Sequence, residues 1–322
     1  MKEIGMGVVM VYAMLSSVSY RVPYAQHNIF YPLSFAEYRN DVVVLQQKQG
    51  LPNSLATITK IPVKKENAPR IPTISAKAAL LVDDESDAIL WEQEASQQIP
   101  LASLTKLIAV MTYLDLGIDP NKKYTVTKGD VIDERSNLVE GDVVASRDLV
   151  MMALVGSSNS AAHSLMTSSG LTKEYFVARM NMTAKKLGLN NTIFVEPTGL
   201  APENRGTAYD VYRLLKAARV MPQFVDSAKL PSYEYAVSET KTKTIAATDA
   251  LITGKVPFHG EKIIAAKTGY IPESGFHLAI TAKDASGRTR TAVVLGAADT
   301  LLRFSEADAL LLWSSRAFTV PR

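Results

Sequence analysis

Ser103 and Lys106 are the first residues whose types and spacing could do chemistry together. Residues three apart on a helix project from one face, and the apolar run around Ser103-Leu104-Thr105-Lys106 predicts a helix. A serine hydroxyl becomes nucleophilic when a base takes its proton, and a lysine amine of lowered pKa can be that base. The spacing alone is weak evidence, because Ser238-Glu239-Thr240-Lys241 repeats it in a polar segment without a helical pattern.

Two further short motifs follow in the chain. Ser157-Ser158-Asn159 forms a polar turn between two apolar helical runs, and its simplest interpretation is a helix N-cap. Lys267-Thr268-Gly269 continues the apolar strand Ile263-Ile264-Ala265-Ala266, where the lysine could simply protect an edge strand from pairing. A glycine at this point would also let the backbone of a ligand approach closely. The three motifs together, in this order, are the set shared by penicillin-binding proteins and class A β-lactamases.

The elements that must position these motifs divide into strands at both ends and helices between them. Alternating or continuous apolar runs predict five strands, at 78–82, 88–91, 262–270, 276–283 and 290–296. Helical periodicity predicts six helices, at 101–111, 147–155, 160–168, 171–187, 207–221 and 301–318. This order predicts an α+β fold, an antiparallel sheet flanked by helices and interrupted by a helical insertion.

Composition excludes several classes of protein. The 322 residues are 47% hydrophobic and 21% charged, as expected for a folded globular chain rather than a disordered one. A net charge of +3 is too small to indicate a nucleic-acid partner. The absence of cysteine excludes a thiol nucleophile, disulfides and thiolate metal sites. The four histidines have no metal-binding spacing, and we interpret them as unrelated surface or loop residues, so we expect no metal or organic cofactor.

The N-terminal region differs from the rest of the chain. The apolar stretch 4–19 has the length of a signal-peptide core, so residues 1–25 are expected to be a signal peptide or an N-terminal anchor. Residues 26–74, which end in a proline-rich and basic run, are expected to be an extension or linker. Residues 75–320 are then the catalytic domain.

Residues from about 75 to 318 resemble the serine-type D-Ala-D-Ala carboxypeptidases and endopeptidases, the low-molecular-mass penicillin-binding proteins of the peptidase S11 type. Beyond the three motifs, the similar segments are Ile99 to Leu107, Glu196-Pro197-Thr198-Gly199-Leu200, Thr207-Ala208-Tyr209-Asp210, Lys267 to Tyr270 and Val293-Val294-Leu295-Gly296. The resemblance implies the β-lactamase/transpeptidase-like fold. It also implies cleavage of peptidoglycan stem peptides through an acyl-enzyme, with β-lactams as inhibitors and no cofactor.

The resemblance also implies the catalytic roles. Ser103 would be the acylated nucleophile and Lys106 its base. The charge of Lys267 would help to keep Lys106 neutral, since like charges disfavour a second proton. Ser157 would relay a proton to the leaving group, and Asn159 would orient Lys106 and the substrate amide.

The remaining implied residues bind substrate. Lys267, Thr268 and Gly269 would hold the terminal carboxylate, and we expect Arg303 near it. The backbone N–H groups of Ser103 and Tyr270 would form the oxyanion hole. We expect an exported protein acting in the periplasm or elsewhere outside the cytoplasm, with membrane attachment only through the N-terminus.

Two other functions stay open, a serine β-lactamase and a non-catalytic peptidoglycan-binding protein of the same fold. A class A β-lactamase needs a Glu-x-x-x-Asn loop, and residues 196–200 do not supply one. The chain also departs from the family where Glu196 replaces the usual Asp, which puts the anchoring of that loop in question. Two strands and a helix fill the sequence after Gly269, so we expect no separate C-terminal domain and an endopeptidase-like member.

Overall fold

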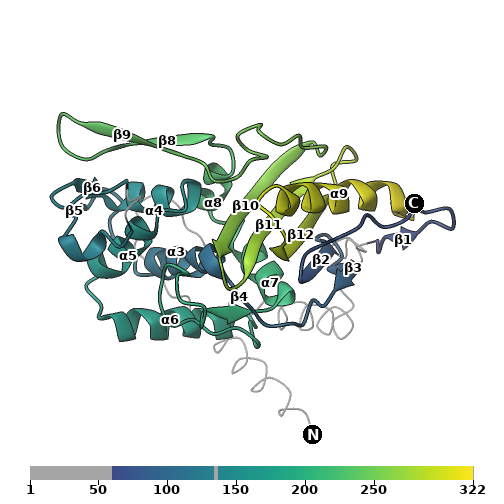
Figure 1. Ribbon diagram of the computed structural model, residues 1–322, viewed down its shortest axis with the longest axis horizontal. Coiled ribbons are helices and arrows are strands. Elements are labelled where there is room, and N and C mark those ends of the chain that lie inside the picture. The colour runs from purple at the N-terminus through teal and green to yellow at the C-terminus, as the bar shows by residue number, and fades with distance from the viewer. Residues whose placement is uncertain (1–59, 134–136, 322) are drawn as a thin grey trace, which may run out of the picture.

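The computed structural model describes residues 60–133 and 137–321, and its centre is a five-stranded antiparallel sheet (Figure 1). The strand order is β10-β11-β12-β2-β3, so strands from the start of the domain pair with strands from its end in one sheet. The strands are β2 (Ala78–Asp83), β3 (Ala88–Gln93), β10 (Lys262–Ile271), β11 (Gly275–Lys283) and β12 (Thr289–Ala297). The predicted α+β fold, with an antiparallel sheet and a helical insertion, is confirmed.

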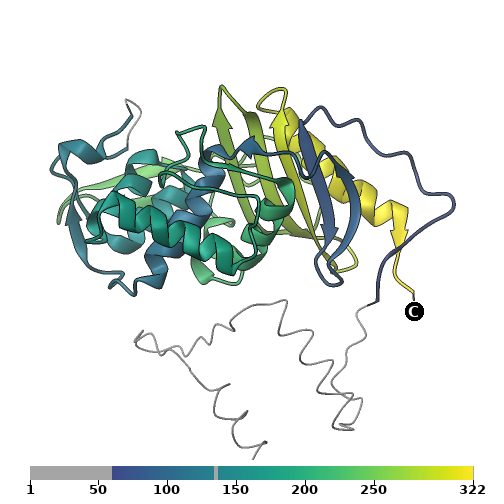
Figure 2. The ribbon, with the colours of Figure 1, turned by 90° about the horizontal axis from the view of Figure 1, so that it is seen from below.

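Alternation along the strands divides the interior into two hydrophobic cores. On β2, Ala78, Leu80 and Val82 pack toward the helical insertion, whereas Ala79 and Leu81 pack toward helix α9 (Leu302–Ala317). This division follows from the strand geometry, because successive side chains point to opposite faces of a sheet. Both faces are covered, which explains why the central strands are continuously apolar (Figure 2).

The helical insertion between β3 and β10 carries the first two motifs. Its helices are η2 (Ala102–Leu104), α3 (Thr105–Asp115), η3 (Lys128–Asp130), α4 (Ser146–Val155), α5 (Asn159–Ser168), α6 (Lys173–Lys186), α7 (Ala208–Ala218) and α8 (Pro222–Ser227). The helix predicted over 207–221 is α7, which ends at Ala218, and a further short helix that was not predicted, α8, begins at Pro222.

Short two-stranded sheets fill the remainder of the insertion. They are β4 (Ile99–Pro100) with β7 (Arg205–Gly206), β5 (Lys123–Thr125) with β6 (Val143–Ala145), and β8 (Ser232–Ala236) with β9 (Thr242–Ala246). The sequence analysis did not predict these sheets. The second Ser-x-x-Lys copy, at 238–241, lies in the connection between β8 and β9, away from any helix.

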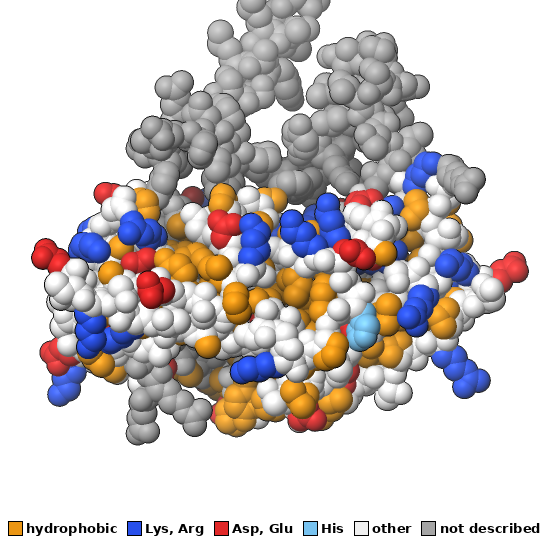
Figure 3. Space-filling model, turned by 90° about the horizontal axis from the view of Figure 1, so that it is seen from above, with side chains coloured by type: hydrophobic (Ala, Val, Ile, Leu, Met, Phe, Trp, Pro, Cys, Tyr) orange, Lys and Arg blue, Asp and Glu red, His pale blue; other side chains and the backbone are white. Residues whose placement is uncertain are grey.

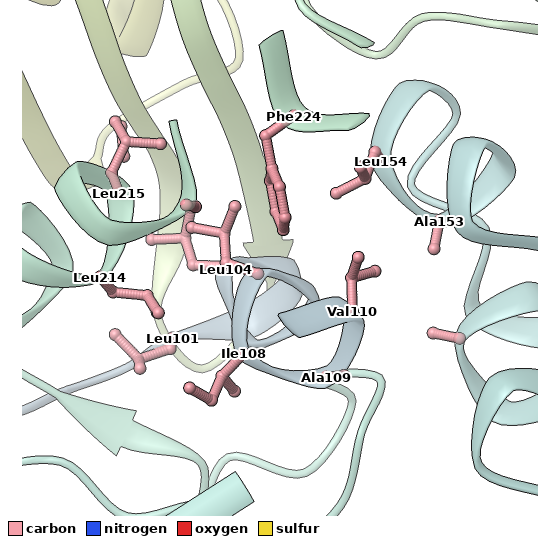
Figure 4. Packing of buried hydrophobic residues seen from close by; sticks show 14 of the residues in the cluster. Leu101, Leu104, Ile108, Ala109, Val110, Ala153, Leu154, Leu214, Leu215 and Phe224 are labelled. Atoms are coloured by element: carbon pink, nitrogen blue, oxygen red, sulfur yellow. The ribbon is translucent and has the colours of Figure 1, made fainter. Parts of the chain in front are cut away.

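Apolar side chains fix the segment around Ser103 in the helical core. Leu101 and Leu104 are fully buried, and α4, α7 and α8 contribute neighbours to the same cluster (Figure 4). Leu107 and Ile108 extend this contact along α3. Ser103 therefore lies between buried residues, Leu101 before it and Leu104 after it, that cannot move without opening a cavity.

Residues 60–74, expected to belong to a linker, pack along the C-terminal helix. Strand β1 (Val63–Lys64) pairs with β13 (Phe318–Thr319) immediately after α9. The Trp313 indole of α9 donates a hydrogen bond of 2.9 Å to the carbonyl of Pro69. The predicted signal peptide or anchor at 1–25, and most of the predicted extension, lie outside the described residues.

The described residues include no helix long and apolar enough to cross a membrane. On the face shown in Figure 3, lysine and arginine side chains are spread among acidic and apolar ones. This distribution is typical of a solvated protein surface.

Replacing Leu104 by Ala tests how far this packing stabilises the fold. We expect the free energy of unfolding to fall by about 2–5 kcal/mol, because the substitution leaves a cavity in a closely packed core. Leu301→Ala is the control, since Leu301 is 59% exposed, and it should change stability by less than about 0.5 kcal/mol. Urea unfolding followed by circular dichroism measures both, and equal losses would contradict this account of the packing.

Candidate active site

Ser103 lies in a strained turn that leads into α3. The helix predicted to start at residue 101 begins as the 3₁₀ turn η2, and the α-helix itself starts at Thr105. Ala102, just before Ser103, has a φ of 48°, in the left-handed region that residues with a Cβ rarely occupy. Such backbone strain persists only where the surrounding structure imposes it, and it is concentrated at functional sites.

The Lys106 amine, one turn beyond Ser103, is fully buried and makes three close contacts. Its Nζ lies 2.8 Å from the Oγ of Ser103, 2.7 Å from the Oδ1 of Asn159 and 2.6 Å from the carbonyl oxygen of Thr198. The Asn159 amide oxygen and the Thr198 carbonyl oxygen can only accept hydrogen bonds. A neutral amine has two hydrogens for these acceptors, and its lone pair is then left facing the Ser103 hydroxyl.

Burial lowers the pKa of Lys106 to about 7, although the nearby carboxylates of Glu196 and Asp133 raise it. The sequence analysis expected the charge of Lys267 to help to keep Lys106 neutral. Burial is instead the main cause. For Lys267 itself, burial lowers the pKa far below its usual range, and the charges of protonated Lys106 and of Arg303 lower it further.

The Ser157-Ser158-Asn159 turn combines a structural and a functional arrangement. Ser158 caps α5, since its Oγ accepts the N–H of Ala161 at 3.1 Å. Ser157 has a φ of 55° and accepts a hydrogen bond of 2.7 Å from the Nζ of Lys267. Asn159, the first residue of α5, reaches Lys106. The N-cap interpretation is therefore correct for Ser158 alone, and its two neighbours face the site.

The Lys267-Thr268-Gly269 segment forms one side of the site. Lys267 is on the edge strand β10 but is only 2% exposed, so it does not act as a solvent-facing lysine that protects the edge. The hydroxyl of Thr268 lies 2.6 Å from that of Thr248. A Cβ added to Gly269 would lie 3.2 Å from the carbonyl oxygen of Leu101, which shows how closely β10 approaches the nucleophile segment. Tyr270, the residue after this segment, is exposed.

Arg303 of α9 is hydrogen-bonded to this strand. Its Nη1 donates a hydrogen bond of 3.1 Å to the carbonyl of Gly269, and its guanidinium lies over the ring of Phe304. Burial lowers the pKa of Arg303 to about 10, and the nearby Asp249 opposes this shift. Arg303 thus places a guanidinium, and Lys267 an amine, beside the Thr268-Gly269 backbone, an arrangement of donors that suits a carboxylate.

Glu196 anchors the 196–200 loop although it replaces the usual Asp. Its carboxylate accepts the N–H groups of Thr198 and Gly199, each at 2.6 Å, and the side-chain amide of Asn204 at 2.5 Å. The loop is thereby anchored with the Thr198 carbonyl aimed at Lys106. With its oxygens occupied by the loop, Glu196 does not resemble the water-activating glutamate of a class A β-lactamase.

The structure thus brings Ser103, Lys106 and Asn159 into direct contact, and Ser157 into contact with Lys267. Sequence reasoning missed the Thr198 carbonyl and the Thr248 hydroxyl, both of which touch residues of the three motifs. Within residues 60–133 and 137–321, no group of three or more metal-ligating side chains could hold a metal ion.

Comparison with known proteins agrees with this geometry. The family model described as Peptidase S11, D-alanyl-D-alanine carboxypeptidase, matches residues 64–299. The chain is 30% identical over 265 residues to a D-alanyl-D-alanine endopeptidase of Pseudomonas aeruginosa, covering 81% of this chain and 84% of that one. It is 27% identical to the D-alanyl-D-alanine endopeptidase of Escherichia coli, covering 78% and 80%. The chain belongs to the peptidase S11 family, and it is a serine-type D-Ala-D-Ala peptidase.

Solved structures show the same fold. The D-alanyl-D-alanine carboxypeptidase of Mycobacterium tuberculosis superimposes with a TM-score of 0.69 at 24% identity, covering 79% of this chain and 96% of that one. The DD-transpeptidase of Streptomyces K15 gives 0.69 at 23% identity, covering 76% and 98%. The penicillin-binding protein fold expected from the sequence is therefore confirmed.

Replacing Gly199 by Ala tests the packing of the loop on the nucleophile. Gly199 has a φ of 86°, and an added Cβ would lie 1.8 Å from the carbonyl oxygen of Ala102. We expect this clash to displace Ser103 and to reduce acylation by penicillin at least about 100-fold.

Gly254→Ala is the matched control, because Gly254 has a φ of 71° and open space around the added Cβ. Both variants should lose about 1 kcal/mol of stability from the unfavourable φ, but only Gly199→Ala should lose acylation. Equal acylation rates in the two variants would show that the loop does not position Ser103.

Proposed function

We propose that Ser103 is the acylated nucleophile and that Lys106 is its general base. The observation that carries the proposal is the Lys106 Nζ, which lies 2.8 Å from the Ser103 Oγ and also within hydrogen-bond distance of the acceptors Asn159 Oδ1 and Thr198 O. When the amine is neutral, its two hydrogens go to these acceptors and its lone pair is left for the Ser103 hydroxyl. A base works best when its pKa lies near the working pH, and burial brings the pKa of Lys106 to about 7.

Ser157, hydrogen-bonded to Lys267, protonates the leaving group. When the acyl bond to Ser103 forms, the departing amine needs a proton, and the proton that Lys106 took from Ser103 can be relayed to it by the Ser157 hydroxyl. Its Oγ accepts a hydrogen bond from Lys267, which leaves its own hydrogen free to point into the site. Water then attacks the acyl-enzyme and restores Ser103.

The remaining motif residues bind the substrate. Lys267, Thr268 and the backbone at Gly269 hold the terminal carboxylate, with Arg303 adding positive charge behind the strand. The N–H groups of Ser103 and Tyr270 stabilise the oxyanion that develops during attack, the kind of interaction that contributes most where water is excluded.

The substrate is a peptidoglycan stem peptide, and we propose that the enzyme cleaves D-Ala-linked crosslinks rather than only removing a terminal D-Ala. The support is the extent of similarity. The chain covers 84% and 80% of two endopeptidases, at 30% and 27% identity. It covers only 64% and 65% of the carboxypeptidases DacC of Escherichia coli and DacD of Salmonella typhimurium. A carboxypeptidase of Streptomyces sp. is covered to 87%, but it is only 25% identical.

We further propose that the protein acts outside the cytoplasm, where peptidoglycan lies. The apolar stretch 4–19 supports this location, because it has the length of an export signal. β-Lactams are expected to acylate the same serine and so inhibit the enzyme.

The first experiment is incubation with a fluorescent penicillin followed by intact-mass analysis over time. A stable adduct on Ser103 is expected, and Ser103→Ala should lose it while keeping its melting temperature. Ser238→Ala is the control, since Ser238 opens the other Ser-x-x-Lys sequence. An adduct that is hydrolysed within seconds would favour a β-lactamase, and no adduct on the native chain would favour a binding protein. Crosslinked and uncrosslinked muropeptides then distinguish endopeptidase from carboxypeptidase activity.

The pH dependence of acylation tests the role of Lys106. Only the neutral amine can accept the Ser103 proton, and below a pKa of about 7 its neutral fraction falls about tenfold per pH unit. The second-order rate constant for penicillin acylation should therefore rise with pH up to about 7 and level off above it. A rate that is constant between pH 5 and 7 would exclude Lys106 as the base.

A further inference from the structure

His277 is a buried titratable residue that the proposed mechanism does not use. It lies on β11, directly opposite Gly269 of β10, and none of its surface is exposed. The sequence analysis treated all four histidines as surface or loop residues, and for His277 this prediction is wrong. By contrast, the side chains of His163 and His259 are 25% and 56% exposed.

Three hydrogen bonds fix the protonation of the His277 ring. The backbone N–H of Gly296 can only donate, so the Nδ1 atom 2.8 Å away must be the unprotonated acceptor. The Nε2 atom therefore carries the hydrogen, and it lies 2.9 Å from the carbonyl oxygen of Pro100 and 2.8 Å from the Oγ of Ser274. Burial lowers the pKa of His277 to about 4, and the cations Arg303 and Lys77 also disfavour a charged ring.

The hydrogen bond from Gly296 exists because the sheet is irregular at this point. The register between β11 and β12 shifts between Phe276 and Leu278, the residues on either side of His277. Gly296 has a φ of 73° there, and its N–H is directed to the imidazole rather than to a strand carbonyl. The bulge thus leaves the Gly296 N–H as a free donor, for which the unprotonated Nδ1 of His277 is a suitable acceptor.

His277 connects the two backbone segments that supply the oxyanion hole. One hydrogen bond holds Pro100, which immediately precedes the turn containing Ser103. The ring itself packs on Gly269, where an added Cβ would lie 3.2 Å from its Cδ2 atom, and Tyr270 follows in the chain. The position of the Ser103 N–H relative to the Tyr270 N–H therefore depends on this ring.

We propose that His277 is a positioning residue that sets the separation of the two oxyanion-hole donors without touching the substrate. This inference rests on the proposed function, in which Ser103 is acylated. An oxyanion interaction forms mainly in the transition state, so its misplacement slows acylation and leaves initial binding nearly unchanged.

The test compares His277→Leu with His277→Gln in the full chain, using a chromogenic penicillin and rapid-mixing kinetics. We expect the acylation rate constant at saturating penicillin to fall about 10- to 100-fold in His277→Leu, with the apparent dissociation constant changed less than about threefold. His277→Gln keeps a donor that can reach the Pro100 carbonyl, and it should recover most of the rate. His259→Gln, at an exposed histidine, is the control and should match the native chain.

The fraction of molecules that become acylated separates positioning from a purely structural role. Positioning predicts complete but slow acylation, whereas loss of structure predicts a smaller acylated fraction that reacts at the native rate. The second result, or a native rate in His277→Leu, would overturn the proposal. If His277→Leu does not fold, a folded His277→Gln that acylates no faster than one-hundredth of the native rate would also overturn it. Absence of a Ser103 adduct on the native chain would instead refute the proposed function.

Discussion

The burial of one amine constrains the rest of the site. Lys106 cannot be solvated where it lies, so the protein must supply partners for each of its hydrogens and for its lone pair. The Ser157-Ser158-Asn159 turn provides one partner and the 196–200 loop provides another. Each of these segments is in turn held by its own anchor, the cap at Ser158 and the carboxylate of Glu196. The hydrogen bonds that the buried Lys106 amine requires therefore determine how the surrounding segments are placed.

Close approach of backbones is the second requirement. The turn containing Ser103 is enclosed between Gly199 on the loop, where an added Cβ would lie 1.8 Å from a backbone oxygen, and Gly269 on β10, where it would make a tight contact of 3.2 Å. Side-chain contacts would tolerate small shifts, but contacts between backbones do not. Rigidity at the site therefore comes from the absence of side chains as much as from the core packing of Leu101 and Leu104.

The sequence predicted the parts of the molecule whose signal is local or periodic. Apolar runs located the five central strands, and motif order located Ser103, Lys106 and Lys267. The β8–β9 hairpin was missed, although Ser232–Ala236 alternates as a strand should, because it is short and polar. The Thr198 carbonyl could not be predicted, since every residue has a carbonyl and only the folded loop shows which one is aimed inward.

The strand order of the sheet also determines when the enzyme can first act. Strand β2 near the start of the domain pairs with β12 near its end, and Asp83 forms an ion pair with Arg288, 205 positions further on. Contacts between such distant segments form slowly, because a long loop must close before any of them is made. Ser103 and Lys106 leave the ribosome early, yet they face no complete site until the final strands arrive. A growing chain that lacks β10 therefore lacks Lys267, Thr268 and Gly269 and has no complete site.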